Sequence, residues 1–599
     1  MYEQGAFSSH KNHKWFLTVY KIEKLHFESR RYKIKGDDER MKLLGADVII
    51  ECLKEQGVDT VFGYPGGQAL IIYDALYRAR NEITHILTSH EQGASHAADG
   101  YARATGKVGV CIATSGPGAT NLVTGIATAY MDSVPMVAIT GQVPTNLLGK
   151  DSFQEVDITG ITMPITKHNF IVKDVTQLAD TMRKAFAIAR EGRPGPVLVD
   201  VCKDVTSTLV EYTPKKPEKK DYVSNKYHDI SNSAIEKAVD AINNAKRPVI
   251  LSGAGVGIAS AEEYVLALAE LADIPVSTSL MGMGTFPGTH KLFMGMVGMH
   301  GTKTSNYAFH NSDLVIAIGN RFSDRIISKV SSFAQEAKIM HIDVDGAEVG
   351  KNLNVDFPLV GDIKKILKAI HSGIIQKNNP EWIEQINKWK EEYPLKYTYS
   401  KEIIRPQYIV ERIYELTRGD AIITTEVGQH QMWAAQYYKY SNFRQFISSG
   451  GLGTMGYGLG ACIGAQLARP DKKVINIAGD GSFRMNLNEL ATAVEYKLPI
   501  IIALFNNRAL GMVRQWQELF FDSRFSQTSI DRGTDFAALA NAFGARGINV
   551  TCPDEVDNAI ISALSETDTP VLINFEIDKD DKVSPIVPPG AALCDVVDC

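Results

Sequence analysis

The sequence predicts an α/β fold built from three doubly wound parallel-sheet domains. Short runs rich in β-branched residues, such as 108–114 and 474–478, alternate with helical stretches such as 93–105 and 176–191. This alternation is typical of parallel sheets that are covered by helices on both faces. A chain of 599 residues is also too long for a single hydrophobic core.

The strand-like runs fall into three blocks, which are separated by charged stretches at 214–220 and 378–401. We expect strands at 108–114, 136–140 and 197–201, then 248–252, 314–318 and 339–343, and finally 421–425, 474–478, 500–505 and 570–574. The corresponding domain boundaries are an N-terminal extension at 1–40, domains at 41–210, 230–375 and 395–585, and a C-terminal tail at 586–599.

The first 40 residues are rich in Lys, Arg, His and aromatic residues and have no apolar segment followed by a cleavage site. A secretory signal is therefore not indicated, and interspersed acidic residues disfavour an organelle transit peptide. The regular pattern starts at Met41. We therefore expect the functional protein to begin there, with residues 1–40 disordered or non-native.

The overall composition excludes several classes of partner. The formal net charge is -6, with 22% charged and 44% hydrophobic residues, and no apolar run has the length of a membrane helix. Neither nucleic acid nor a membrane is an expected partner. The seven cysteines are scattered without a Cys-x-x-Cys pair. A reducing compartment, the cytoplasm, fits this usage best.

A cation and diphosphate site is predicted in the third block. Gly479-Asp480-Gly481 directly follows a strand, and Asn506-Asn507 follows the next strand after 24 intervening residues. The glycines let the backbone approach a phosphate. Asp480, Asn507 and the carbonyl of Ala509 supply hard oxygen ligands for Mg²⁺ or Ca²⁺. Taken singly, each motif would more often be an ordinary turn.

Together these two motifs resemble the cofactor motif of the thiamine-diphosphate enzyme superfamily. Its members hold thiamine diphosphate between a diphosphate-binding domain, here the third, and a pyrimidine-binding domain, here the first. The second would be a central flavin-binding domain. The resemblance implies cofactor contacts from Gly66, Glu91, Val427, Gly428, Gln429, Gly453, Met455, Gly479, Asp480, Gly481, Ser482, Asn507, Gly511 and Met512. Met455 matches the bulky residue that wedges the cofactor into a bent shape.

Glu91 resembles the activating glutamate of this superfamily. It stands in Thr88-Ser89-His90-Glu91-Gln92-Gly93, between a short strand and a helix. In the family its carboxyl group shares a proton with the pyrimidine N1′ of a cofactor held by the partner subunit. An isolated glutamate at this place would more simply compensate the helix dipole.

Further motifs narrow the resemblance. Residues 153–155, 298–302, 321–325 and 511–517 together are similar to biosynthetic acetolactate synthase catalytic (large) subunits, and the likeness covers about residues 41–590. That family decarboxylates pyruvate and transfers the two-carbon unit to a second pyruvate or to 2-ketobutyrate. This is the first common step of valine, leucine and isoleucine biosynthesis.

The resemblance also assigns substrate contacts. Arg325 would bind the acceptor carboxylate and Trp516 its small alkyl group. Phe153, Gln154 and Lys203 match family residues that line the active site. Trp516 could instead only pack, and Lys203 could be a solvated charge at a strand end.

The second block is similar to the family's FAD domain, whose flavin has no redox role in the net reaction. Gly253-Ala254-Gly255 follows a strand and opens a helix, an arrangement that suits a phosphate. Asp343 ends another strand, where it could hold a ribose hydroxyl. The implied set is Arg193, Gly253, Gly255, His300, Arg321 and Asp343. The glycine turn alone would be a weak signal.

The family assembles as homodimers or homotetramers with sites built across the interface, often with a small regulatory subunit. Three other functions stay open: a related thiamine-diphosphate decarboxylase, oxidase or carboligase; a flavin- or nucleotide-binding scaffold without catalysis; and an NAD-dependent oxidoreductase. Four positions depart from the family pattern, namely Cys202, Ser323, Gly460 and Arg484. We expect Arg484 to affect the electrostatics of Asp480, and Gly460 to loosen a turn.

Overall fold

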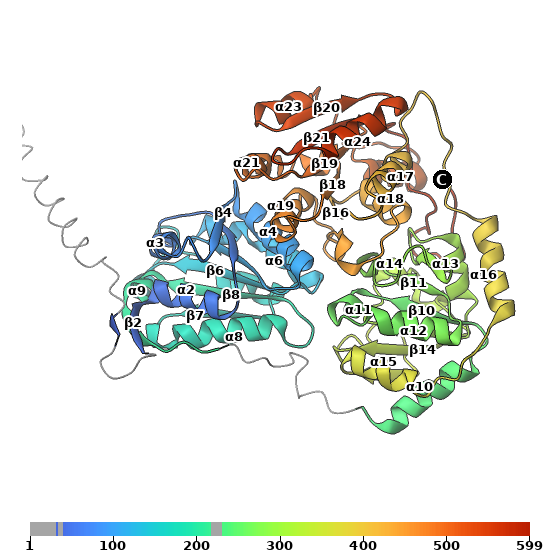
Figure 1. The fold of residues 1–599 in the computed structure, drawn as a ribbon, viewed down its shortest axis with the longest axis horizontal. Helices are drawn as coiled ribbons and strands as arrows, with labels where there is room; N and C mark the ends of the chain where they lie inside the picture. The colour runs from blue at the N-terminus through green and yellow to red at the C-terminus, as the bar shows by residue number, and fades with distance from the viewer. Residues whose placement is uncertain (1–31, 34–39, 217–229) are drawn as a thin grey trace, which may run out of the picture.

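The computed structural model describes residues 32–33, 40–216 and 230–599, and it confirms the predicted fold class (Figure 1). Three sheets of six parallel strands each form the centre of one α/β domain. The described residues include only 32–33 and 40 of the predicted N-terminal extension. They also leave out residues 217–220 of the predicted linker, so the predictions for these two segments lie outside the described residues.

The N-terminal domain has the strand order β4-β3-β5-β6-β8-β7, and a small antiparallel sheet, β1-β2-β9, lies beside it. Its elements are β1 (Tyr32–Lys33), β2 (Met41–Leu44), α2 (Gly45–Glu55), β3 (Thr60–Gly63), α3 (Leu70–Arg78), β4 (Thr84–Leu87), α4 (Glu91–Thr105), β5 (Gly109–Ala113), α5 (Pro117–Asn121), α6 (Val123–Met131), β6 (Met136–Gln142), α7 (Ile158–Thr162), β7 (His168–Val172), α8 (Leu178–Arg190), β8 (Pro196–Cys202), α9 (Lys203–Ser207) and β9 (Leu209–Tyr212).

The middle domain has the order β12-β11-β10-β13-β14-β15. Its elements are α10 (Asn232–Asn244), β10 (Pro248–Ser252), α11 (Ala254–Ile258), α12 (Glu262–Ala272), β11 (Val276–Thr278), β12 (Phe293–Met296), α13 (Lys303–His310), β13 (Leu314–Ile318), α14 (Asp324–Ile327), β14 (Lys338–Asp343), β15 (Phe357–Val360), α15 (Ile363–His371) and α16 (Pro380–Glu392).

The C-terminal domain has the order β17-β16-β18-β19-β21-β20. Its elements are α17 (Pro406–Leu416), β16 (Ile422–Thr425), α18 (Gln429–Tyr437), β17 (Phe446–Ile447), α19 (Gly458–Ala468), β18 (Val474–Gly479), α20 (Asp480–Phe483), the 3₁₀ turn η7 (Leu487–Glu489), α21 (Leu490–Glu495), β19 (Ile501–Asn506), α22 (Gly511–Phe520), α23 (Phe536–Ala542), β20 (Arg546–Val550), α24 (Val556–Leu564) and β21 (Val571–Glu576).

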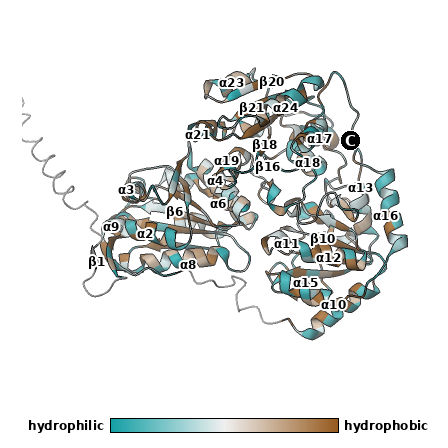
Figure 2. Cartoon of the chain, viewed as in Figure 1, coloured by the Kyte–Doolittle hydropathy of each residue, from teal (hydrophilic) through white to brown (hydrophobic). Residues whose placement is uncertain are grey.

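The predicted strands lie within a residue or two of the observed ones. For example, the run 474–478 corresponds to β18 and the run 314–318 to β13. These strands are buried on both faces, so they are hydrophobic along nearly their whole length rather than at alternate positions; Asn476 of β18 is the polar residue in these two strands. Figure 2 shows hydrophobic colour in the sheets, with hydrophilic residues on the outer sides of helices such as α10 and α16.

The stretch 378–401, interpreted from its charge as a divider, instead contains the helix α16. Trp382 of this helix donates a hydrogen bond from Nε1 to the carbonyl of Pro248 at 3.1 Å, and Ile386 joins the core of the middle domain. The helix was missed because only these few apolar positions point inward. Residues of the C-terminal tail, among them Val587 and Leu593, pack in the same core.

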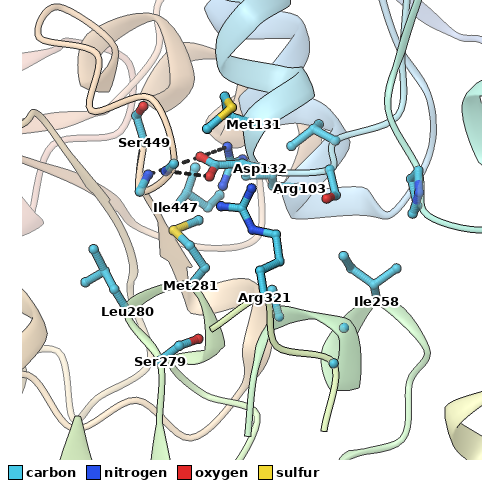
Figure 3. A pocket seen from close by; sticks show the side chains of 18 of the residues that line it. Arg103, Met131, Asp132, Ile258, Ser279, Leu280, Met281, Arg321, Ile447 and Ser449 are labelled. Carbon is cyan, nitrogen blue, oxygen red and sulfur yellow. Dashed lines mark hydrogen bonds and ion pairs between the residues drawn. The ribbon is translucent and has the colours of Figure 1, made fainter. Parts of the chain in front are cut away.

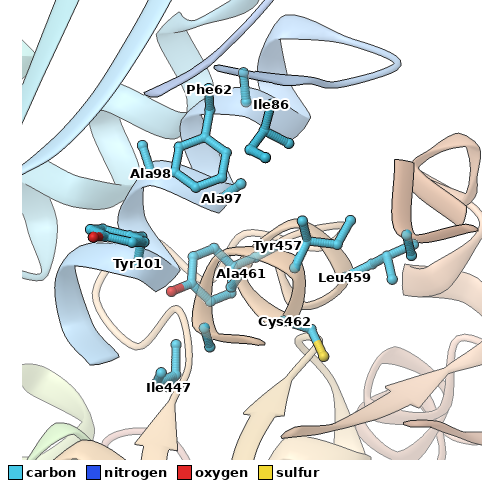
Figure 4. Packing of buried hydrophobic residues seen from close by; sticks show 14 of the residues in the cluster. Phe62, Ile86, Ala97, Ala98, Tyr101, Ile447, Tyr457, Leu459, Ala461 and Cys462 are labelled. Carbon is cyan, nitrogen blue, oxygen red and sulfur yellow. The ribbon is translucent and has the colours of Figure 1, made fainter. Parts of the chain in front are cut away.

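Helices α4 and α19 join the N-terminal and C-terminal domains (Figure 4). Both carry small residues where they meet: a Cβ added at Gly464 would lie 1.9 Å from the carbonyl oxygen of Ala97, and one at Gly100 would lie 2.2 Å from that of Ala461. The two backbones can approach this closely only because no side chain intervenes. Among the described residues, no helix is both long and apolar enough to cross a membrane.

Candidate active site

The predicted residues of the N-terminal domain gather at the carboxyl edge of its sheet. Glu91 begins α4 and is 9% exposed, and Asn121 donates a hydrogen bond from Nδ2 to Glu91 Oε2 at 2.9 Å. A Cβ at Gly118 would lie 3.1 Å from Glu91 Oε1, and one at Gly66 would lie 2.4 Å from Thr114 Cγ2. Gly66 and Gly118 therefore make room for the side chain of Thr114, and Gly118 also lies close to the carboxylate of Glu91.

Phe153, Gln154 and Lys203 belong to the same domain. A Cβ at Gly116, on the loop that precedes α5, would lie 2.9 Å from the Gln154 carbonyl oxygen, and Lys203 directly follows β8. The side chain of Phe153 is 84% exposed. Within the described part of the chain, no hydrogen bond or ion pair connects these three side chains or Glu91 with Asp480 or Asn507.

The predicted cation ligands come together at the ends of β18 and β19. Asn507 Oδ1 accepts a hydrogen bond from the backbone N–H of Ala509 at 3.0 Å, and Asn507 Nδ2 donates to Gln429 Oε1 at 3.4 Å. Asp480 is 1% exposed, and its Oδ1 is buried without a hydrogen-bond partner in the described chain. Burial raises the pKa of this carboxyl group to about 7, and the positive charge of Arg484 acts in the opposite direction. The predicted influence of Arg484 on Asp480 is thus confirmed.

This arrangement fits a hard divalent cation with a diphosphate. A Cβ at Gly511 would lie 1.9 Å from Gln429 Oε1, and one at Gly479 would lie 2.6 Å from His430 Nδ1, so these glycines make room for the side chains of Gln429 and His430. No group of three or more His, Cys, Asp and Glu residues forms a metal cage in the described chain. A site with one carboxylate, one amide and one carbonyl suits Mg²⁺, which takes its other ligands from phosphate and water.

Two buried residues that the sequence motifs did not single out complete this cluster. Glu426 is fully buried and accepts hydrogen bonds from Ser482 Oγ at 2.7 Å, from Gly456 N at 2.8 Å and from Leu459 N at 3.0 Å. Burial raises its pKa. It therefore ties the loop that carries Gly453 and Met455 to the segment of Asp480. In the sequence, the one indication of this role was that Glu426 directly precedes Val427, a predicted cofactor contact.

His430 is the second such residue. Its Nε2 is buried without a hydrogen-bond partner in the described chain, and burial lowers its pKa to about 3, so the ring is neutral. Both Gly428 and Gly479 leave space for it, because a Cβ at either position would collide with the ring. His430 immediately follows the predicted contact Gln429, and a neutral imidazole can donate to a phosphate oxygen.

A cavity of about 1290 Å³ lies where the three domains meet (Figure 3). It brings together residues predicted for FAD, for the substrate and for thiamine diphosphate. The residues expected for FAD are Arg193, Gly255, His300, Arg321 and Asp343, and those expected for substrate or thiamine diphosphate are Val427, Gly428, Gly453, Met512, Arg325 and Trp516.

The charges along this cavity suit a phosphate-bearing ligand. The guanidinium of Arg321 projects into the cavity and has no hydrogen-bond or ion-pair partner among the described residues, and burial lowers its pKa. Arg193 forms an ion pair with Glu348 at 2.6 Å, and burial raises the pKa of Asp343 to about 6. A partly buried cation without a partner favours an anion from outside the chain. Gly253, although it does not line the cavity, packs directly against Gly319.

The predicted substrate pair meets across two domains. The guanidinium of Arg325, from α14, lies 5.8 Å from the ring centroid of Trp516, from α22. Arg325 also points Nη1 at the sulfur of Met299, at 3.7 Å. Trp516 Nε1 is buried without a hydrogen-bond partner in the described chain. A cation and an indole therefore lie side by side on the cavity wall.

Comparisons with known proteins agree with this geometry. Family models for the thiamine pyrophosphate enzymes match their N-terminal TPP binding domain to residues 43–161, their central domain to 235–370 and their C-terminal TPP binding domain to 426–575. A probable acetolactate synthase large subunit of Methanococcus aeolicus is 48% identical over 92% of this chain and 95% of its own length.

Two bacterial relatives are nearly as similar. The acetolactate synthase large subunit of Haemophilus influenzae is 44% identical over 93% of this chain and 98% of its own length. The acetolactate synthase isozyme 3 large subunit of Escherichia coli is 42% identical over 92% of this chain and 98% of its own length. The chain therefore belongs to the thiamine pyrophosphate enzymes and, among them, to the family of acetolactate synthase large subunits.

Proposed function

We propose that this protein is an acetolactate synthase. It decarboxylates pyruvate and transfers the resulting two-carbon unit to a second pyruvate or to 2-ketobutyrate, giving 2-acetolactate or 2-aceto-2-hydroxybutyrate, at the head of branched-chain amino acid biosynthesis. The meeting of Arg325 with Trp516 on the cavity wall carries this proposal. The guanidinium suits the carboxylate of the acceptor, and the indole suits its methyl or ethyl group. The names of the relatives support the same activity.

Thiamine diphosphate, when bound, supplies the carbanion chemistry, and the chain's own residues hold and orient it. Asp480, Asn507 and the carbonyl of Ala509 would hold Mg²⁺ at the diphosphate. Glu91 would hold a proton at the pyrimidine N1′, and Met455 would support the bent shape. Asp480 Oδ1 has no hydrogen-bond partner in the described chain, which supports this assignment, because a buried carboxylate oxygen normally has a partner.

FAD would occupy the part of the cavity lined by Arg193, Gly255, His300, Arg321 and Asp343. The supporting observation is the guanidinium of Arg321, which has no hydrogen-bond or ion-pair partner among the described residues and fits a phosphate. His300 supports the same site: its Nδ1 is buried without a partner in the described chain, and burial lowers its pKa to about 4.

A second copy of the chain would complete the site. Phe153, Gln154 and Lys203 accompany Glu91 in the N-terminal domain, and the 84% exposure of Phe153 suits a residue that is covered by a partner. We therefore propose a homodimer, or a homotetramer built from dimers, with each site shared between two chains. Since the relatives are named large subunits, a small regulatory subunit is a further proposed partner. The seven unpaired cysteines favour the cytoplasm.

An assay of the purified protein tests the proposed function. The protein is incubated with pyruvate, and thiamine diphosphate, Mg²⁺ and FAD are omitted one at a time. We expect acetolactate and CO₂ in the complete mixture and a loss of product on each omission. Acetaldehyde or acetate in place of acetolactate would indicate a decarboxylase or an oxidase and would contradict the proposal.

A further inference from the structure

A buried ion network connects the N-terminal domain with the glycine-rich loop, which we define as residues 450–456. Arg103 Nε lies 2.6 Å from Asp99 Oδ1, and Arg103 Nη2 lies 3.0 Å from Asp132 Oδ2. Tyr457, directly after the loop, donates a hydrogen bond from its hydroxyl to Asp99 Oδ1 at 2.5 Å. The side chains of both aspartates are fully buried.

Asp132 is the member of the network that touches the loop itself (Figure 3). It stands at the C-terminal end of α6, and its two carboxylate oxygens accept the backbone N–H of Gly450 at 3.1 Å and of Gly451 at 2.7 Å. About one turn earlier on the same helix, the hydroxyl of Thr128 lies 2.7 Å from that of Thr454. One helix of the N-terminal domain therefore holds two points of the loop.

The loop needs such an anchor because its own sequence does not fix its shape. It contains four glycines, and Gly453 has a φ of 70°, a conformation that glycine reaches without strain. Leu452 beside it is 44% exposed and adds little packing. The far end is fixed at Gly456, whose N–H is bound by Glu426 and whose carbonyl oxygen is bound by Asn486. Without Asp132, the near end would lose both of its backbone hydrogen bonds to α6.

Fold stability alone does not account for this network, since a buried ion pair is often no more stabilising than well-packed apolar side chains. The network instead fixes the position of the loop, because the Asp132 carboxylate accepts hydrogen bonds from two consecutive backbone N–H groups, those of Gly450 and Gly451. We propose that Asp132 is a positioning residue that, held by Arg103, fixes the glycine-rich loop in the conformation that receives thiamine diphosphate. This inference rests on the proposed function, in which Gly453 and Met455 of the loop contact the cofactor.

Cofactor binding to the Asp132→Asn variant tests the inference. Thiamine diphosphate is titrated into cofactor-free protein with Mg²⁺ present, and binding is followed by tryptophan fluorescence and independently by activity. If the loop has to become ordered during binding, affinity is lost, so we expect the half-saturating concentration of thiamine diphosphate to rise by about tenfold or more. Turnover at saturating cofactor should stay within about threefold of that of the native protein. The melting temperature is recorded in parallel.

The matched control is Asp200→Asn. Asp200 is also a buried aspartate of the N-terminal domain, 1% exposed, and it accepts hydrogen bonds from Thr140 and Gln142 rather than from the loop. We expect this variant to lose stability without changing the half-saturating concentration by more than about twofold, since the loop keeps its anchor. A comparable weakening in both variants would mean that general destabilisation is the cause, and it would overturn the inference.

Should Asp132→Asn fail to fold, Arg103→Lys keeps the charge beside Asp132 but loses the planar fork that bridges the two aspartates. We expect the half-saturating concentration to rise by about threefold in this variant, because Asp132 is held less firmly. Native affinity in whichever of these variants folds would overturn the inference. Failure of the native protein itself to bind thiamine diphosphate would instead refute the proposed function.

Discussion

Asp480 is 1% exposed at the start of α20, and burial holds its pKa at about 7, well above its ordinary value of 3.8. Between these two values the folded protein keeps a proton that the unfolded chain has lost. The carboxyl group therefore costs stability that grows as the pH rises through this window, and the cost persists above it. A bound cation would remove this cost.

Asp480→Asn should consequently make the metal-free protein more stable at pH 8, by on the order of a few °C in melting temperature. At pH 4, where the native carboxyl group is mostly protonated, the two proteins should melt at similar temperatures. Thermal unfolding of metal-free protein at both pH values checks this. Mg²⁺ with thiamine diphosphate should raise the melting temperature of the native protein only. If Asp480→Asn were less stable than the native protein at pH 8, the buried carboxylate of Asp480 would not be lowering the stability of the metal-free protein.

Glu91→Gln should leave the fold intact, because glutamine has the same shape and keeps an oxygen that can accept from Asn121. Turnover should fall by on the order of 10²–10⁴-fold, since the amide cannot share a proton with the pyrimidine. Acetolactate formation and the melting temperature are measured together. An unchanged rate with an unchanged fold would remove Glu91 from the proposed chemistry.

Trp516→Leu should keep acetolactate formation but lower the preference for 2-ketobutyrate over pyruvate by roughly tenfold, which is the discrimination that one methylene group permits. The measurement is the product ratio when both acceptors compete. Trp389→Leu, a tryptophan of α16 that packs against Tyr307 and Trp382, is the control and should leave the ratio unchanged. Equal ratios in all three proteins would show that Trp516 only packs.

Some of the site residues could be predicted from sequence motifs and others could not. Asp480 and Asn507 follow strands whose ends meet at one sheet edge, so their proximity was predictable from topology. Glu426 and His430 were not predicted, because their importance comes from burial and from the glycines that leave room for them, and neither is visible in sequence spacing. Arg325 and Trp516 were paired only through the resemblance, since they lie in different domains.

At the scale of elements, the ten strands that were predicted match closely because full burial leaves a continuous apolar run, as in β13. The strands for which no run was named, such as β7 and β20, include partly exposed positions. Helix α16 could not, because only Trp382 and Ile386 are buried in it. The expectation that Gly460 loosens a turn was wrong. Gly460 lies inside α19, where a Cβ would come within 2.8 Å of His96 Cβ, so glycine permits close packing against α4.

The contact between α4 and α19 is itself testable. Gly464→Ala adds helix propensity worth about 1 kcal/mol. The new Cβ would, however, meet the Ala97 carbonyl oxygen at 1.9 Å and force the helices apart. Overpacking of this kind costs about 1–3 kcal/mol or more, so we expect a net loss of stability.

Denaturant unfolding measures the effect of Gly464→Ala. Gly346→Ala serves as the control, because its Cβ would make an ordinary 3.5 Å contact with Val360, and it should unfold nearly as the native protein does. Native stability in the Gly464 variant would show that α4 and α19 are not closely packed.

At the scale of the whole molecule, Glu91, Asp343 and Asp480 each lie at the carboxyl end of a strand in a different one of the three sheets. All three domains line the 1290 Å³ cavity, but Glu91 is not part of its lining and makes no hydrogen bond to Asp480 within the described chain. Large apolar side chains on the N-terminal domain, including Leu70, Phe153 and Met163, are more than half exposed. A second copy that covers them would bring the two halves of a site together.

Complementation between two inactive variants tests this most directly. Glu91→Gln and Asp480→Asn chains are each expected to be inactive alone, and they are then co-expressed so that mixed dimers form. In a mixed dimer one site keeps both Glu91 and Asp480. With random pairing the mixture should therefore regain about a quarter of native acetolactate synthesis. If the mixture stays as inactive as its parents while mixed dimers are shown to form, the catalyst is not shared between chains.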